Sequence, residues 1–196
     1  ASETCALDLI DASYVREVNP GEIVMIDDAG IHSYSIPVKA TPKQCIFEHI
    51  YFARPDSIIF SDTVHEIRKE FGRQLAREHP VEADIVMAIP DSGNSAALGY
   101  AEESGIPFDI GMTRNHYVGR TFIQPDQKIR DFGVKVKLNP IRSALKGKRV
   151  VVIDDSLVRG TTSKRRVSAI LDAGAKEVHV RISSPPIRNT CHFGID

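Results

Sequence analysis

The chain has 196 residues, of which 42% are hydrophobic, and this is enough to fill one substantial core. Its 25 Lys and Arg residues nearly balance 26 Asp and Glu residues, so the net charge of -1 gives no bulk case for binding nucleic acid or an anionic membrane. No apolar run approaches the ~20 residues of a membrane span, and no signal peptide opens the sequence. We therefore expect neither nucleic acid nor a membrane as a partner.

Residues 1–43 contain short strand-like segments and no predicted helix. Turn sequences separate these segments at residues 19–21 and 27–30, and the second turn suits a tight hairpin. We predict an antiparallel β segment that is too small to hold a core by itself. The predicted strands cover residues 7–10, 15–18, 22–26 and 31–38.

From residue 44 onward, helical patterns alternate with short apolar runs. Thr63 and Glu66 have the spacing of a capping box and precede a predicted helix. Strands are predicted over 85–89 and 108–112, with a helix over 96–103 between them, which makes a βαβ unit. The apolar stripe of the first helix consists of Val64, Ile67, Phe71 and Leu75.

Residues 114–137 are cationic and poor in apolar periodicity, which is typical of a mobile lid. Closing such a lid over an anionic ligand would exclude water from the reaction. A solvated basic loop is the alternative that charge alone favours. The cations of this segment are Arg114, Arg120, Lys128, Arg130 and Lys137.

Residues 150–153 are apolar and mostly β-branched, which predicts a buried strand that stops at two carboxylates, Asp154 and Asp155. A loop rich in hydroxyl groups follows, and the helix behind it offers unpaired N–H groups and the positive end of its dipole to a phosphate. The carboxylates can accept hydrogen bonds from sugar hydroxyls or hold hydrated Mg²⁺. The predicted phosphate loop consists of Ser156, Arg159, Gly160, Thr161, Thr162 and Ser163.

The helix behind this loop is expected to bury Val167, Ile170 and Leu171 and to end near Gly174. Strand, loop and helix therefore occur in this order twice in the chain. The alternation predicts an α/β fold with a parallel sheet and ligand loops at the carboxyl ends of its strands. A solvated face is the default for the basic cluster at the start of this helix. That cluster is Lys164, Arg165 and Arg166.

The run VVVIDDSLVRGTT, residues 150–162, resembles the phosphoribosylpyrophosphate (PRPP) signature of the type I phosphoribosyltransferases. The resemblance implies their fold, a mostly parallel sheet flanked by helices, in which the acidic pair meets the ribose and the next loop holds the 5′-phosphate. It also implies that the earlier loop receives the pyrophosphate through Asp91, Ser92 and Gly93. Magnesium would then lie near Ser92, Asp154 and Asp155.

The sequence of the predicted lid points to a more specific family. NHYVGRTFIQP, together with the acidic motif and with SETCALDL at the start, resembles the glutamine PRPP amidotransferases over essentially the whole chain. That family's lid is close to KNRYVGRTFI, so Arg114 replaces a lysine and His116 replaces an arginine here. The resemblance implies that ammonia and PRPP give 5-phosphoribosylamine and pyrophosphate, the first step of purine synthesis, in a homo-oligomer. The implied catalytic residues are Asp154, Asp155, Arg114, Tyr117, Arg120 and Lys137.

The same resemblance divides the chain into two parts. Residues 1–43 resemble the end of the family's glutaminase domain, and residues 44–196 its phosphoribosyltransferase domain. The family's glutaminase uses an N-terminal cysteine, whereas this sequence begins with Ala1. We therefore expect use of ammonia and not of glutamine, with a glutaminase domain or subunit as the missing partner, and a structural role for Cys5.

Three cysteines lie far apart without any CxxC pair, which favours a reducing, cytoplasmic setting over a disulfide framework. In one branch of the family, Cys45 and Cys191 match two of the four ligands of an iron–sulfur cluster. Two cysteines cannot hold such a cluster without further ligands. We expect a cluster only where additional chain supplies the other two.

Two other functions fit the PRPP loop. A salvage phosphoribosyltransferase would transfer the sugar to a nucleobase and would need a stacking aromatic such as Tyr117 or Phe122. A PRPP-sensing regulator would bind without catalysis, but nothing in the sequence is typical of a DNA-recognition helix or a basic face.

Overall fold

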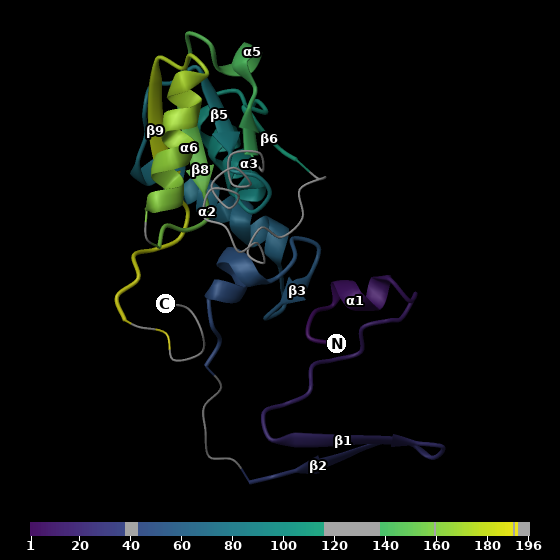
Figure 1. Ribbon diagram of the computed structural model, residues 1–196. Helices are drawn as coiled ribbons and strands as arrows, with labels where there is room; N and C mark the ends of the chain where they lie inside the picture. Colours follow the sequence, from purple (N-terminus) through teal and green to yellow (C-terminus); the bar gives the residue numbers. More distant parts are fainter. Residues whose placement is uncertain (38–42, 116–137, 159, 190, 192–196) are drawn as a thin grey trace, which may run out of the picture.

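The computed structural model describes residues 1–37, 43–115, 138–158, 160–189 and 191. In these residues the predicted α/β architecture is confirmed by a parallel sheet with strand order β5-β8-β9 (Figure 1). β5 spans Ile85–Ala88, β8 spans Arg149–Asp154 and β9 spans Glu177–Ile182. β5 and β8 agree with predicted strands, whereas β9 lies outside the predicted strands.

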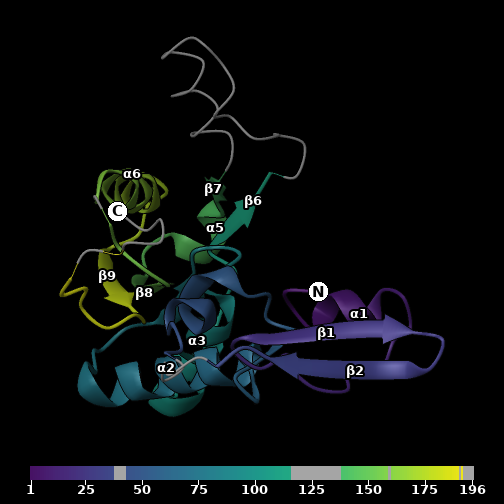
Figure 2. The same ribbon diagram turned by 90° about the horizontal axis from the view of Figure 1, so that it is seen from below.

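Both faces of the sheet are covered, which is why β5 and β8 are apolar almost throughout. The helix α6 (Thr161–Asp172) lies on one face, and α2 (Val64–Glu78) and α3 (Asn94–Ser104) lie on the other (Figure 2). The core on the α6 side includes Ile85, Met87, Val150, Val152 and Ile170. The core on the other side includes Leu75, Val86, Tyr100, Val151 and Ile153.

The helices α2 and α3 pack with their backbones close together because each has a glycine at the crossing. A Cβ atom on Gly72 would lie 1.9 Å from the carbonyl oxygen of Ala96, and one on Gly99 would lie 1.9 Å from that of Lys69. Any side chain at either position would push the helices apart. α3 ends at Gly105, whose φ of 70° is the left-handed conformation of a helix C-cap.

α2 begins directly after Thr63, as predicted, but the predicted capping box with Glu66 is wrong. Among the described residues Thr63 makes no side-chain hydrogen bond to the helix start. Ile67 and Phe71 of the predicted apolar stripe are only partly buried, because the close contact with α3 rotates the buried face toward the glycine. The buried residues of α2 are Val64, Arg68, Gly72, Leu75 and Ala76.

The strand predicted over residues 108–112 is only partly correct. Phe108 makes an isolated parallel bridge with Val86, after which the chain leaves the sheet. Met112–Arg114 forms β6, which pairs antiparallel with β7 (Leu138–Pro140). The short helix α5 (Arg142–Leu145) then leads into β8.

α6 begins after Gly160, whose φ of 70° requires a residue without a Cβ atom. Ile170 is fully buried, as expected, whereas the expectation for Leu171 is wrong because its side chain is 45% exposed. The helix ends one residue before Ala173, and Gly174 follows with a φ of 102°, close to the predicted end. No helix in the described ranges has both the length and the apolar character that crossing a membrane requires.

The predicted N-terminal hairpin is confirmed by β1 (Glu22–Asp27) and β2 (Gly30–Ser35), which pair antiparallel and extend away from the α/β body (Figures 1 and 2). The strand predicted over residues 7–10 is wrong, because Cys5–Asp8 forms the short helix α1. Residues 15–18 form no strand either. Cys5 is buried, in keeping with a structural role.

Residues 48–63 connect the hairpin region to α2. Glu48–Phe52 forms the π-helix η1, and Ile58–Ile59 (β3) pairs antiparallel with Asp62–Thr63 (β4). Glu3 accepts hydrogen bonds from the Arg54 N–H at 2.8 Å and from the Ser57 hydroxyl at 2.8 Å. The first residues of the chain are therefore fastened to this connecting region.

Candidate functional site

The two predicted ligand loops lie side by side at the carboxyl ends of β5 and β8. The Ile89 N–H donates to the Ile153 carbonyl at 2.9 Å, which extends the strand pairing to the start of the first loop. A Cβ atom on Gly93 would lie 2.6 Å from that same carbonyl oxygen and 3.0 Å from the Ile89 oxygen. Only glycine allows the first loop to approach β8 this closely, so the sequence predicted the meeting of the two loops correctly.

Asp154 is the last residue of β8 and Asp155 follows it, and both are 5% exposed. The Asp155 N–H donates to Oδ1 of Asp154 at 3.1 Å, and the Ser156 hydroxyl donates to Oδ1 of Asp155. The carbonyls of the pair accept from the N–H groups of Ser183 and Ser184 at 3.0 Å, so the segment after β9 holds their backbone. Two neighbouring carboxylates are thus buried at the end of a central strand.

Arg166 from α6 supplies a cation to this acidic pair. Its Nη1 donates to Oδ2 of Asp154 at 2.7 Å. Burial raises the pKa of the Asp154 carboxyl to about 6, the Arg166 guanidinium opposes this rise, and the charge of Asp155 adds to it. The desolvation penalty on the ionised Asp154 carboxylate is therefore larger than the stabilisation that Arg166 provides.

A second cation, Arg68 of α2, approaches from the opposite layer. Its side chain is 4% exposed, and it donates to the carbonyls of His49 at 2.6 Å and Ala53 at 2.8 Å. Burial lowers the pKa of Arg68, while the negative charges of Asp155 and Glu3 oppose this effect. Arg68 thus places a buried positive charge between the acidic pair and the N-terminal residues.

The predicted phosphate loop lies between Asp155 and the start of α6. Gly160 is the N-cap, and its carbonyl accepts the first helical hydrogen bond from the Lys164 N–H at 2.9 Å. The N–H groups of the first helical turn have no partner within the helix, so they are available to an anion. Thr161 and Thr162 are exposed, Ser156 and Ser163 are partly buried, and Arg159 lies outside the described residues.

In the predicted pyrophosphate loop, Asp91, Ser92 and Gly93 form the turn between β5 and α3, with a cis peptide bond between Pro90 and Asp91. Arg114, the last residue of β6, donates from Nη1 to Oδ2 of Asp91 at 2.6 Å. The structure therefore brings one predicted lid cation to this loop. The other predicted catalytic residues of the lid, Tyr117, Arg120 and Lys137, lie outside the described residues.

Arg166 and Arg68 were not among the predicted site residues. Arg166 belongs to the basic cluster that we interpreted as a solvated face, and that interpretation is wrong for this residue. The sequence position of Arg166 does indicate a place near the loop. A helical side chain leans toward the helix N-terminus, and Arg166 lies in the second turn of α6, directly behind the loop. Arg68 carries no local signal, since only the packing of α2 against η1 shows that it is buried.

The oxygen atoms at this site suit a Mg²⁺ ion that the protein coordinates only in part. Two adjacent carboxylates and nearby hydroxyls are the ligands of a Mg²⁺ that keeps water and substrate phosphates in its remaining positions. Among the described residues, no group of three or more His, Cys, Asp or Glu side chains is placed to hold a metal ion. The donor set therefore fits a metal that arrives with a phosphorylated substrate.

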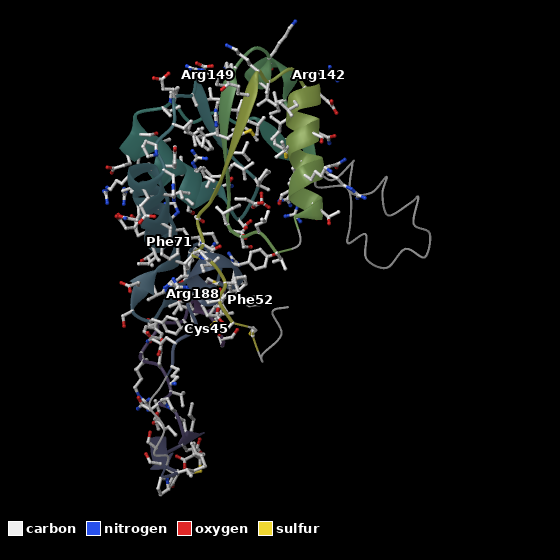
Figure 3. The ribbon with its side chains drawn as sticks, turned by 90° about the vertical axis from the view of Figure 1, so that its left-hand side faces the viewer. Cys45, Phe52, Phe71, Arg142, Arg149 and Arg188 are labelled. Atoms are coloured by element: carbon white, nitrogen blue, oxygen red, sulfur yellow. The ribbon has the colours of Figure 1, made fainter. Side chains whose placement is uncertain are left out.

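The predicted cluster cysteines are Cys45 and Cys191. Cys45 is exposed just before η1, and Cys191 is partly buried. Figure 3 places Cys45 and Arg188 toward the end of the body that faces the hairpin, and Arg149, which begins β8, at the opposite end. An iron–sulfur cluster at Cys45 and Cys191 stays a prediction from resemblance.

Comparison with known proteins shows which family of enzymes this chain resembles. The chain is 63% identical over 196 residues to the chloroplastic amidophosphoribosyltransferase of Vigna aconitifolia, a match that covers 100% of this chain and 40% of that protein. It is 53% identical over 196 residues to the amidophosphoribosyltransferase of Synechococcus elongatus, again covering 100% of this chain and 40% of that protein. Over its whole length the chain is therefore similar to a part of the amidophosphoribosyltransferases. No family model matches it.

A solved amidophosphoribosyltransferase has the same fold. Glutamine phosphoribosylpyrophosphate amidotransferase from B. subtilis, complexed with ADP and GMP, matches with a TM-score of 0.90 at 54% identity and covers 99% of this chain and 43% of that chain. The predicted resemblance and fold are therefore confirmed. The chain spans only 40% of the length of these curated amidophosphoribosyltransferases.

Proposed function

We propose that this chain binds PRPP with magnesium and transfers its phosphoribosyl group to ammonia, giving 5-phosphoribosylamine and pyrophosphate. The observation that carries the proposal is the buried pair Asp154 and Asp155 at the end of β8, with a helix N-terminus on one side and the Gly93 turn on the other. A sugar that carries a 5′-phosphate and a 1′-diphosphate has complementary groups in the same order. The similarity to amidophosphoribosyltransferases over the whole chain supports the same reaction.

Each part of the chain has a role in this reaction. The loop of residues 159–163 binds the 5′-phosphate, and the acidic pair accepts hydrogen bonds from the ribose hydroxyls. The Gly93 turn receives the diphosphate, where Ser92 and the acidic pair would hold Mg²⁺. When bound, the metal offsets the charge that develops on the departing pyrophosphate. Arg114, Tyr117, Arg120 and Lys137 would surround this leaving group from the lid.

Bond breaking at C1′ leaves positive charge on the ribose ring, and ammonia then attacks from the face opposite to the leaving pyrophosphate. Buried carboxylates near the ring favour that charge, since the low local dielectric strengthens the attraction. Free ammonia needs no general base. Use of ammonia without glutamine, a glutaminase domain or subunit as partner, a homo-oligomeric state and a cytoplasmic location also stay predictions.

The experiment that tests the proposal is pyrophosphate release from PRPP and Mg²⁺ at alkaline pH, with ammonium or glutamine as the nitrogen donor. We expect release that follows ammonium and ignores glutamine. In the double variant D154N/D155N, release should fall by roughly a hundredfold or more, because both carboxylates lose their charge while the shape is kept. Turnover near that of the parent in this variant would contradict the assignment.

The same assay separates the two other candidates. Turnover with adenine or hypoxanthine and none with ammonium would identify a salvage phosphoribosyltransferase. PRPP binding without release under any condition would mean either that further segments are needed to close the lid or that the chain only senses PRPP. No feature of the described residues favours either function over transfer to ammonia.

A further inference from the structure

The basic cluster at the start of α6 does not behave as one solvated face. Lys164 is exposed, whereas the Arg166 side chain is only 26% exposed and its Nε atom is buried without a hydrogen-bond partner among the described residues. The guanidinium reaches Asp154 at 2.7 Å. One member of the cluster is therefore built into the site.

The Arg166 side chain connects the phosphate loop with the acidic pair. Arg166 stands on the same helix whose first turn, residues 161–163, offers its N–H groups to the phosphate. Its side chain leans back over that turn and ends at the last residue of β8. The phosphate loop and the acidic pair are thus linked by a side chain as well as by the backbone.

Two hydrogen bonds fix the orientation of the Asp154 carboxylate. Oδ1 accepts from the Asp155 N–H at 3.1 Å and Oδ2 accepts from Arg166 Nη1 at 2.7 Å. Each carboxylate oxygen has a second lone pair, so both remain able to accept a hydroxyl group. The charge-assisted bond from arginine is the stronger of the two, and without it only the weaker bond opposes rotation about χ2.

We propose that Arg166 is a positioning residue that holds the Asp154 carboxylate in the orientation that receives the ribose hydroxyls of the substrate. This inference rests on the proposed function. It assigns a role in sugar recognition to a side chain that does not itself need to touch the sugar. Phosphate binding at the loop does not depend on this role.

The test compares two ligands that differ only in the sugar. Ribose 5-phosphate probes the loop and the acidic pair together, and inorganic phosphate probes the loop alone. Calorimetric titrations would be made with the parent, with R166M, which removes the donor, and with R166K, which keeps the charge. The matched control is K164M, which removes one positive charge from the same turn of α6 without a contact to Asp154.

We expect R166M to lose roughly tenfold in affinity for ribose 5-phosphate, the size of one charge-assisted hydrogen bond, while its affinity for phosphate changes less than about twofold. R166K should recover part of the loss, and K164M should bind ribose 5-phosphate nearly as the parent does. Thermal unfolding of each variant gives the folded fraction, and if R166M does not fold, the partial loss in R166K decides the question.

Three results would overturn the inference. They are parent-like binding of ribose 5-phosphate by R166M, an equal loss for both ligands, or the same loss in K164M. Each leaves the proposed function standing as long as the parent binds ribose 5-phosphate more tightly than phosphate. If the parent itself shows no such preference, the proposed function and the inference both fail.

Discussion

Arg114 and Asp91 form an ion pair at 2.6 Å that ties the end of β6 to the turn after β5. Their side chains are 44% and 58% exposed, so water and salt screen the attraction and the pair contributes little to stability. We predict that the pair matters for ligand binding. Asp91 holds a cation that we predict for the diphosphate, and it places a negative charge where that anion would lie.

Asp91→Asn should therefore strengthen the binding of pyrophosphate measured without divalent metal. We expect a gain of roughly two- to fivefold at low ionic strength that shrinks at higher salt, because the effect is electrostatic. Calorimetry at two salt concentrations would measure it. Asp109→Asn is the control, since it breaks another exposed pair, with Lys148 at 3.7 Å. Weaker binding in D91N, or an equal gain in D109N, would contradict the prediction.

The raised pKa of Asp154 predicts that this site destabilises the folded protein at neutral pH. Burial raises the pKa from its ordinary value of 3.8 to about 6, so between these values the unfolded chain ionises while the folded chain stays protonated. Stability contributed by this group is present below about pH 4, is lost as pH rises to about 6, and stays lost above it.

Asp154→Asn removes this penalty and keeps an oxygen that can accept from Arg166. We expect the variant to be about 2 to 3 kcal/mol more stable than the parent above pH 7, and nearly equal to it near pH 4. Denaturant unfolding of both proteins across this pH range would measure the difference. A difference that does not change with pH would mean that desolvation of Asp154 is not its cause.

Gly99→Ala should destabilise the protein by about 2 kcal/mol or more, because the new Cβ atom would lie 1.9 Å from a backbone oxygen of Lys69 that cannot move alone. Leu98→Ala changes the neighbouring residue, whose side chain is 36% exposed, and should cost less than about 1 kcal/mol. Denaturant midpoints of the two variants would test the contrast. Equal costs would show that α2 and α3 can separate freely.

The central elements of this fold can be predicted from local sequence because neighbouring residues alone show where each element begins and ends. β8 contains a run of consecutive β-branched residues, 150–153, and this run stops at two aspartates, so the strand, its boundary and the loop are all visible in the local sequence. The turn at Gly93 is recognisable for the same reason. These are the parts where propensity, burial and ligand chemistry agree.

The remaining errors have both local and distant causes. In β9, Val178, Val180 and Ile182 alternate with His179 and Arg181, which is the local pattern of a half-buried strand, and β8 pairs with this strand along its whole length. α1 replaces a predicted strand where four residues can form one helical turn and bury Cys5. The direction in which Arg166 leans follows from its place in α6, but its contact with Asp154 depends on how α6 packs beside β8, which no local pattern gives.

The fastening of the first residues has a mechanical consequence. Glu3 and the Arg54 N–H are joined although they lie 51 residues apart, and Thr4 accepts from the Ile58 N–H at 2.8 Å beside them. The chain between these points, which includes the whole hairpin, forms a loop that hydrogen bonds close at its base. Tension applied to the tip of the hairpin would therefore load these hydrogen bonds before it stretched any strand of the parallel sheet.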